Sequence, residues 1–196
     1  MNHKHYRKKE IFSIPNIMSY LRLILIPVFC TLYLTAKTSK DYYIAAGVVL
    51  ISSLTDLFDG WVARRFNQIT DLGKVLDPVA DKLTHAALAL CLAIRHPLMW
   101  ALLALMVVKE GYMAVMGLKF LKKGQMLDGA LWFGKVSTAV LFACLFLLFL
   151  FPELPTAAVN TAIVLMIVFL SFSFYRYASV YRKMERGEMK EGVKEL

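Results

Sequence analysis

Four aspartates in two pairs define the chemistry that this sequence could perform. Asp56 and Asp59 are three residues apart, and Asp77 and Asp81 are four apart. On helices, these spacings place the two members of each pair on one face. Four converging carboxylates repel one another unless cations bridge them, and their oxygens suit hard divalent ions such as Mg²⁺ or Mn²⁺. Two such ions about 3.5–4 Å apart stabilise a phosphoryl transition state, so the pattern predicts a two-metal phosphoryl-transfer site.

Small residues and one arginine accompany the aspartates. Gly60 and Ala63 follow the first pair, and Gly73 precedes the second. Small side chains let a bulky ligand approach the backbone, and Gly73 also suits a tight turn. Arg64 can bind phosphate oxygens in a bidentate fork.

The elements that position these residues are apolar helices. The chain has 196 residues, of which 59% are hydrophobic, whereas soluble domains have about 45–50%. A bilayer core needs about 20 apolar residues per helix. The sequence predicts an all-α membrane protein of one domain, 1–196, with six transmembrane helices at roughly 16–36, 42–66, 77–95, 97–121, 131–151 and 156–180.

The remaining segments are polar. Residues 1–15 mix basic and apolar side chains, which predicts a short N-terminal interfacial helix before Pro15, and 182–196 form a charged cytoplasmic tail. The net charge of +9 is distributed as expected for a membrane surface, not for nucleic acid. Cys30, Cys91 and Cys144 lie inside apolar runs and are interpreted as small core residues.

Lysine and arginine predict the orientation. With both termini on one side, that side holds Lys4, Arg7, Lys8, Lys9, Arg64, Arg65, Lys74, Lys119, Lys122, Lys123, Arg176, Arg182, Lys183, Arg186, Lys190 and Lys194. The other side holds only Lys37, Lys40 and Arg95. Both termini are therefore predicted to be cytoplasmic. A short connection joins the second and third spans, so they are expected to be antiparallel neighbours whose four carboxylates meet at the cytoplasmic edge.

Residues 56–81 read D-x2-D-G-x2-A-R-x8-G-x3-D-x3-D. This resembles the signature of the CDP-alcohol phosphotransferase family at all eight positions, and the resemblance extends over essentially the whole chain. Members transfer the lipid-bearing phosphoryl group of a CDP-linked lipid or alcohol to an acceptor hydroxyl, with release of CMP. The resemblance implies two Mg²⁺ or Mn²⁺ ions held by Asp56, Asp59, Asp77 and Asp81. It also implies Asp81 as the catalytic base, and a CDP site lined by Asp56, Gly60, Ala63, Arg64 and Gly73.

The first span carries a second resemblance. IPNIMSYLRLILIPVF is similar to the opening of bacterial phosphatidylglycerophosphate synthases and of CDP-alcohol type cardiolipin synthases, which commonly read P-N-x-(L/I)-T-x-x-R. Pro15, Asn16 and Arg22 match, and Ser19 keeps the hydroxyl of threonine. Asn16 and Ser19 are therefore expected to contact CDP. ITDLGKVLDPVADK is also close to the matching segment of these synthases.

The second half departs from these synthases. They often have Arg-Glu in the fourth span, where this chain has Lys109-Glu110. They often read GKxKT in the fifth span, where this chain has Lys135 but Ser137. Lys135, Arg22 and Lys109 are predicted to bind the acceptor, and Arg22 is also compatible with a pair to a headgroup or to an aspartate. Lys109-Glu110 is equally compatible with an ion pair that ties helices together, and His85 is interpreted as a packed histidine rather than a site residue.

The predicted substrates are CDP-diacylglycerol and an alcohol, with glycerol 3-phosphate favoured because cationic side chains gather near the cytoplasmic mouth. Cardiolipin, phosphatidylinositol phosphate and phosphatidylserine synthases are the alternatives within the family. A cation-coupled transporter is the alternative from another class, but the aspartates lie at one edge and paired broken helices are missing. The resemblance also implies a homodimer, with the third and fourth spans as its contact surface, in the bacterial cytoplasmic membrane.

Overall fold

A computed structural model describes residues 13–65, 72–122 and 131–187. Every regular element in these residues is an α-helix. The helices are α2 (Ile14–Thr35), α3 (Ser39–Arg65), α4 (Gly73–Ala93), α5 (Met99–Lys122), α6 (Trp132–Leu150) and α7 (Thr156–Glu185). Each one overlaps one of the six predicted spans, because the apolar runs end at glycine, proline or charged residues where helices end. The predicted interfacial helix within 1–15 lies outside the described residues, apart from its last positions, where α2 begins with Pro15 in its first turn.

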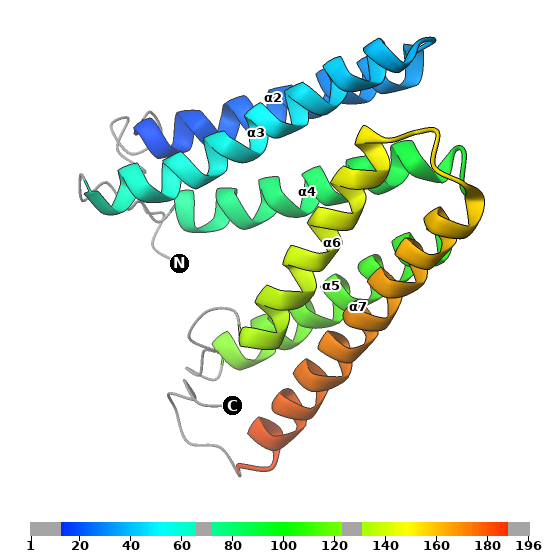
Figure 1. The fold of residues 1–196 in the computed structure, drawn as a ribbon. Helices are drawn as coiled ribbons and strands as arrows, with labels where there is room; N and C mark the ends of the chain where they lie inside the picture. Colours follow the sequence, from blue (N-terminus) through cyan, green and yellow to red (C-terminus); the bar gives the residue numbers. More distant parts are fainter. Residues whose placement is uncertain (1–12, 66–71, 123–130, 188–196) are drawn as a thin grey trace. The chain divides into compact units, whose positions relative to one another are not determined.

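The helices form two compact units (Figure 1). The first comprises Met1–Cys91 and Phe149–Pro152, and the second comprises Leu92–Leu148 and Glu153–Leu196. The first unit therefore holds α2, α3 and nearly all of α4, together with the four aspartates. The second unit holds α5, α7 and most of α6, together with Lys109 and Lys135.

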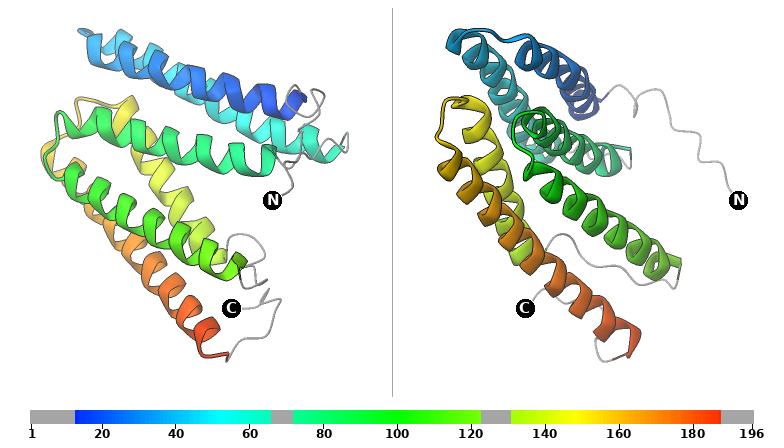
Figure 2. Two further views of the ribbon diagram at one scale, coloured as in Figure 1. Left: turned by 180° about the vertical axis from the view of Figure 1, so that it is seen from behind. Right: turned by 90° about the vertical axis from the view of Figure 1, so that its right-hand side faces the viewer.

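In the first unit, α2 and α3 lie side by side and run in opposite directions (Figures 1 and 2). A tight connection joins them, and the Asp41 carboxylate accepts the backbone N–H groups of Lys37 and Thr38 at 2.9 and 2.8 Å. These two bonds hold the pKa of Asp41 below its usual value. Tyr33 of α2 stacks on Phe149 with ring centroids 4.1 Å apart, which closes the apolar end of this unit.

Contacts between α2 and α4 occur in the same order along both helices. Ser19 contacts Asp77, Arg22 contacts Asp81, and further along, the thiols of Cys30 and Cys91 are hydrogen-bonded. The two helices therefore run in the same direction, as the first and third helices of an up-down-up arrangement must. Cys30 and Cys91 are both free thiols.

In the second unit, aromatic side chains join α5 to α7. Tyr112 packs edge-on against Phe174 with ring centroids 5.3 Å apart, and Phe120 stacks on Tyr181 at 5.6 Å. Aromatic pairs at these separations stabilise a contact beyond the area that they bury. At the end of the same seam, Lys119 pairs with Glu185.

Tyr177 connects α7 to the start of α6. Its ring is 3% exposed and packs edge-on against Phe133 with centroids 4.8 Å apart. Its hydroxyl accepts the backbone N–H of Leu131 at 3.2 Å. The first N–H groups of a helix have no partner within the helix, so Tyr177 satisfies one that the helix itself leaves unbonded. The same hydroxyl lies so close to Gly134 that a Cβ there would be 2.3 Å from it.

Four helices are long and apolar enough to cross a membrane: α2 over Asn16–Thr35, α5, α6 and α7. Their apolar side chains also face outward; Val107 and Val115 of α5 are 72% and 65% exposed, which suits lipid. The chain is therefore an all-helical membrane protein, as predicted. Of the six predicted spans, these four are thus long and apolar enough to cross a membrane. The sequences of α3 and α4 include the charged residues of the aspartate motif, and six spans stay a prediction.

The contact between Gly134 and Tyr177 yields a stability prediction. Gly134→Ala would push the Tyr177 hydroxyl off its bond to Leu131, because the new Cβ would lie 2.3 Å from the hydroxyl oxygen and 3.0 Å from ring atoms. We expect the variant to lose about 1–3 kcal/mol, the usual cost of overpacking. A thermal melt of the purified protein in detergent measures this loss.

Gly111→Ala is the matched control, since nothing lies within 4 Å of a Cβ at this helical glycine. It should be neutral or stabilising, because alanine favours a helix over glycine by about 1 kcal/mol. Adding Tyr177→Phe to Gly134→Ala should recover part of the loss. If both glycine variants melt alike, the close packing of Tyr177 on Gly134 is wrong.

Candidate active site

A row of polar side chains is buried on α2. Asn16, Ser19 and Arg22 are 0%, 0% and 1% exposed. Their spacing of three residues keeps them on one face of the helix, and the other faces of α2 carry exposed apolar residues such as Ile24. A helix with a polar row of this kind must meet polar partners where it packs, since an unpartnered buried polar group costs free energy.

The partners are the carboxylates of α4. Asp77 and Asp81 lie one turn apart near the start of this helix, and the residue between them on the inner side, Ala80, is fully buried. One turn later, Thr84 donates its hydroxyl to the carbonyl of Ala80 at 2.9 Å. Gly73 is buried at the first position of the helix.

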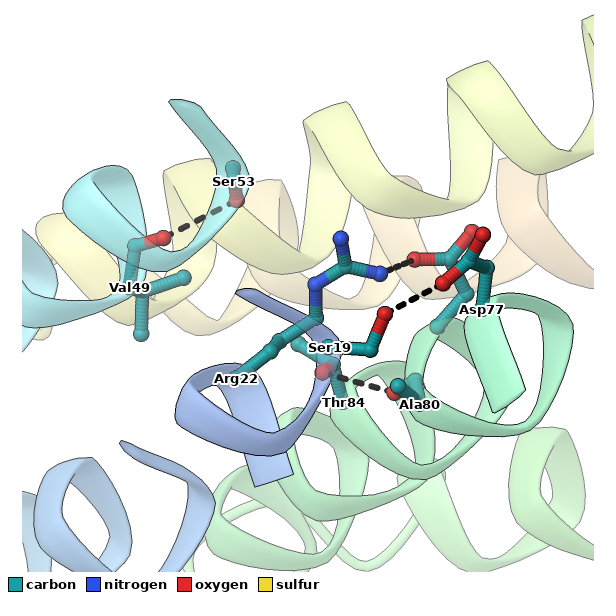
Figure 3. A network of polar contacts seen from close by, with 8 residues as sticks. Ser19, Arg22, Val49, Ser53, Asp77, Ala80 and Thr84 are labelled. Atoms are coloured by element: carbon teal, nitrogen blue, oxygen red, sulfur yellow. Dashed lines mark hydrogen bonds and ion pairs between the residues drawn. The ribbon is translucent and has the colours of Figure 1, made fainter. Parts of the chain in front are cut away.

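Two contacts join the polar row of α2 to the carboxylates of α4 (Figure 3). The Ser19 hydroxyl donates to Oδ1 of Asp77, and Nη1 of Arg22 donates to Oδ1 of Asp81 at 2.8 Å. The ion pair is unevenly buried, because the side chain of Arg22 is 2% exposed and that of Asp81 is 47% exposed. Asp81 therefore faces the open side of the contact, and Arg22 lies behind it.

The donor set fits a hard divalent cation. Both carboxylates use Oδ1 for their contacts with α2, and no hydrogen bond from the described residues reaches either Oδ2. Two carboxylate oxygens one turn apart, with no nitrogen or sulfur donor in the pair, match the ligands of Mg²⁺ or Mn²⁺. Asp77 and Asp81 can thus offer Oδ2 to cations while α2 holds Oδ1.

The other pair lies on the last turns of α3. This helix is continuous to Arg65, so Asp56, Asp59 and Ala63 share one of its faces, as the spacing predicts. Gly60 and Arg64 lie on the same turns. The side chains of 56–65 are outside the described set, and their roles stay predictions. Only residues 66–71 separate α3 from the next described residue, so the motif spans one short connection.

In the second unit, Lys109 is buried on α5. Its ammonium bonds Oε1 of Glu110 at 2.8 Å and lies 6.0 Å from the centre of the Tyr177 ring. The ion pair that the sequence suggested for Lys109-Glu110 is present, with both residues on α5. The Tyr177 ring of α7 lies beside the Lys109 ammonium.

Lys135 and Ser137 lie on different faces of α6. Lys135 is exposed, whereas Ser137 is 2% exposed and packed. Residues two apart on a helix point in nearly opposite directions. The position at which the related synthases often have a second lysine is therefore buried here, and Lys135 is the cation on the open face. Its role toward an acceptor, like that of Lys109, stays a prediction.

Sequence reasoning assigned Ser19 to the nucleotide and Arg22 to the acceptor, and also considered an aspartate or a headgroup as the partner of Arg22. In the structure both side chains contact aspartates of α4. The three-residue spacing of Asn16, Ser19 and Arg22 was the available signal. Sequence reasoning also overlooked Tyr177. The only available signal was an aromatic residue among polar residues near the end of the last predicted span. His85 is buried on α4, as a packed histidine would be.

Comparison with known proteins independently supports the family that the aspartate motif indicates. The sequence model of the CDP-alcohol phosphatidyltransferase family matches residues 12–173. The chain is 32% identical over 176 residues to the CDP-diacylglycerol--glycerol-3-phosphate 3-phosphatidyltransferase of Shigella flexneri serotype 5b (strain 8401), covering 87% of this chain and 96% of that protein. It is 35% identical over 131 residues to the protein of the same description from Escherichia coli (strain K12), covering 65% of this chain and 71% of that protein.

A third relative has a different description. A cardiolipin synthase (CMP-forming) / mitochondrial hydrolase fusion protein of Schizosaccharomyces pombe (strain 972 / ATCC 24843) is 35% identical over 103 residues. The match covers 53% of this chain and 17% of that protein.

The carboxylate donor set predicts a strict need for divalent metal. Asp77→Asn should nearly abolish turnover and weaken Mn²⁺ binding, because an amide carries no charge to balance a cation. EDTA should silence the wild-type protein, and Mg²⁺ or Mn²⁺ should restore it. Release of labelled CMP from CDP-diacylglycerol and titration calorimetry with Mn²⁺ measure the two effects.

Asp41→Asn is the control for this prediction, since Asp41 is a carboxylate at the opposite end of α3 that only caps the helix. It should keep turnover and Mn²⁺ affinity. Full activity of the wild type in chelator would exclude the metal site.

Proposed function

This chain belongs to the CDP-alcohol phosphatidyltransferase family, and on that premise we propose that it transfers a phosphatidyl group from CDP-diacylglycerol to glycerol 3-phosphate, releasing CMP. The products are phosphatidylglycerophosphate and CMP. This acceptor is the one that appears in the names of the relatives from Shigella and Escherichia coli. The match to the Shigella protein covers 87% of this chain and 96% of that protein.

One observation carries the proposal. Asp77 and Asp81, the second half of the aspartate signature, lie one turn apart with Oδ1 fixed by α2 and Asp81 half-exposed. A carboxylate that is both held in place and accessible is what a general base for an incoming hydroxyl requires. The cation-coupled transporter has no comparable support.

The reaction is a displacement at phosphorus. The acceptor hydroxyl oxygen attacks the phosphorus that bears diacylglycerol, its proton passes to the Asp81 carboxylate, and the bond from phosphorus to the CMP oxygen breaks. CMP leaves with that electron pair. Asp81 needs to lie within about 2.6–3.2 Å of the hydroxyl for the proton transfer.

Two divalent ions are the implied cofactors. Asp56, Asp59, Asp77 and Asp81 hold them, and either Mg²⁺ or Mn²⁺ suits these oxygen ligands. When bound, the ions neutralise the diphosphate and stabilise the charge that develops on the leaving CMP.

The nucleotide lies along the end of α3. Gly60 and Ala63 leave room for CDP beside the helix, Arg64 pairs with phosphate oxygens, and Gly73 admits the ligand at the start of α4. Asp56 lies near the nucleotide as well as the metal. Asn16 and Ser19 border this region from α2, where Ser19 also holds Asp77.

Cationic side chains are the proposed ligands of the phosphate of glycerol 3-phosphate. Lys135 is exposed on α6 and binds it directly. Lys109 is buried beside Glu110 and Tyr177 and contributes positive potential. Arg22 was predicted among these cations, but its guanidinium is bonded to Asp81.

The whole chain forms one membrane domain. α3 and α4 complete six spans with the four apolar helices, because their charged ends lie at the membrane surface where metal and headgroup phosphate offset them. Both termini and the active site face the cytoplasm of a bacterial cell. The third and fourth spans form the contact surface of a homodimer.

A cardiolipin synthase is the second candidate. Its support is the match to the fusion protein of Schizosaccharomyces pombe and the loss of a lysine at Ser137. Its acceptor, phosphatidylglycerol, carries less negative charge than glycerol 3-phosphate and needs fewer cations.

The base assignment predicts a separation of binding from chemistry. Asp81→Asn should lose about 10²–10⁴-fold in kcat, the usual contribution of a general base, while it keeps much of its affinity for CDP-diacylglycerol. Asp56→Asn should lose that affinity as well. Rapid-quench kinetics with labelled substrate and equilibrium binding of a CDP-diacylglycerol analogue distinguish the two variants.

Loss of substrate binding with near-normal kcat in Asp81→Asn would contradict the assignment. Asp41→Asn again serves as the control, because it removes one carboxylate far from the signature in sequence.

The acceptor assignment is tested by product identification. The purified protein, given labelled CDP-diacylglycerol with glycerol 3-phosphate, phosphatidylglycerol, inositol phosphate or serine, should convert only the first at a high rate. Lys135→Ala should raise the KM for glycerol 3-phosphate far more than that for CDP-diacylglycerol, because a cation–phosphate contact is lost.

Lys122→Ala is the matched control, since Lys122 is an exposed lysine at the end of α5. It should leave both KM values within about twofold, as expected of a solvent-screened charge. Conversion of phosphatidylglycerol to cardiolipin, with glycerol 3-phosphate ignored, would replace the proposed acceptor.

A further inference from the structure

Arg22 is a charged side chain in an unusual setting. It is among the largest fully buried side chains of the described residues, at 1% exposed. A guanidinium is normally removed from water only where a partner compensates it. Here Nη1 bonds Asp81 at 2.8 Å, so the buried charge has a carboxylate of α4 as a partner.

The burial pattern argues against direct contact with an acceptor. The Asp81 side chain is 47% exposed, but that of Arg22 is 2% exposed. A ligand that approaches α4 from solvent can therefore contact the Asp81 carboxylate, whereas the Arg22 side chain is almost fully covered. Lys135 differs from Arg22 in that its side chain is exposed.

The contact also fixes an orientation. Arg22 holds Oδ1 of Asp81, and one turn earlier Ser19 holds Oδ1 of Asp77. Both carboxylates are thus held by the same helix through the same atom. This determines which way Oδ2 of each points, in the way that an orienting group fixes a catalytic base.

We propose that Arg22 is a positioning residue, which holds the Asp81 carboxylate in the direction needed to receive the proton and to ligate the metal. The proposal rests on the proposed phosphatidyl transfer and replaces the acceptor role predicted for Arg22. Its charge also offsets the repulsion between Asp77 and Asp81, which lie one turn apart.

Arg22→Lys is the variant that tests this role, because lysine keeps the charge but loses the planar fork of the guanidinium. We expect kcat to fall by about 10–100-fold, the usual effect of removing a group that orients a metal ligand. The KM for glycerol 3-phosphate should stay within about twofold of the wild-type value, because Arg22 would not contact the acceptor. Lys135→Ala should show the reverse pattern.

A double-mutant cycle gives the decisive comparison. If Arg22 acts through Asp81, Arg22→Lys should cost nothing further in kcat when added to Asp81→Asn. An equal loss in both backgrounds, or a raised KM for glycerol 3-phosphate in both, would overturn the proposal and return Arg22 to the acceptor.

A second readout needs neither acceptor nor turnover. Mn²⁺ affinity, measured by calorimetry on the purified protein, should fall by about 10-fold or more in Arg22→Lys. Asp41→Asn, which removes a carboxylate at the opposite end of α3, should leave Mn²⁺ affinity unchanged. Unchanged affinity in Arg22→Lys would overturn the proposal. Because this measurement uses no acceptor, it stands even if glycerol 3-phosphate proves to be the wrong substrate.

Discussion

The Arg22–Asp81 ion pair, with the Ser19–Asp77 hydrogen bond beside it, is the contact on which the first unit depends. It gives the two carboxylates of α4 polar partners, and it lets α2, which is apolar enough to cross a membrane, bury an arginine. On insertion scales an isolated charge in mid-bilayer costs about 2.5–3.5 kcal/mol. Pairing the two charges offsets this cost for both helices at one point of contact.

The same contact sets the relative direction of the helices. Since Ser19 meets Asp77 and Arg22 meets Asp81, α2 and α4 run in parallel, and α3 returns between them in the chain. Apolar packing alone would tolerate a shift along the axis, because one apolar side chain replaces another at modest cost. A buried guanidinium tolerates no such shift, since moving it leaves an unpaired charge.

The second unit is held together differently. Its contacts are mainly aromatic, through Tyr112, Phe120, Phe133 and Tyr177, and its one buried cation, among the described residues, is Lys109. Gly134 of the GK motif has a structural explanation in the Tyr177 hydroxyl that lies against it. Gly134 thus permits the close packing of Tyr177 and has a role in stability. Its neighbour Lys135 is exposed on α6.

The sequence by itself determined the helices, their approximate ends and the aspartate motif. Hydropathy identifies apolar helices because each must cover about 20 residues of hydrocarbon, and the spacing of Asp56, Asp59, Asp77 and Asp81 is visible without any fold. What only the tertiary structure decided is which side chains compensate these carboxylates. Ser19 and Arg22 are 58 and 59 residues from their partners, and a single sequence holds no signal that pairs positions so far apart. Their contact follows from how α2 packs on α4, which local periodicity does not determine.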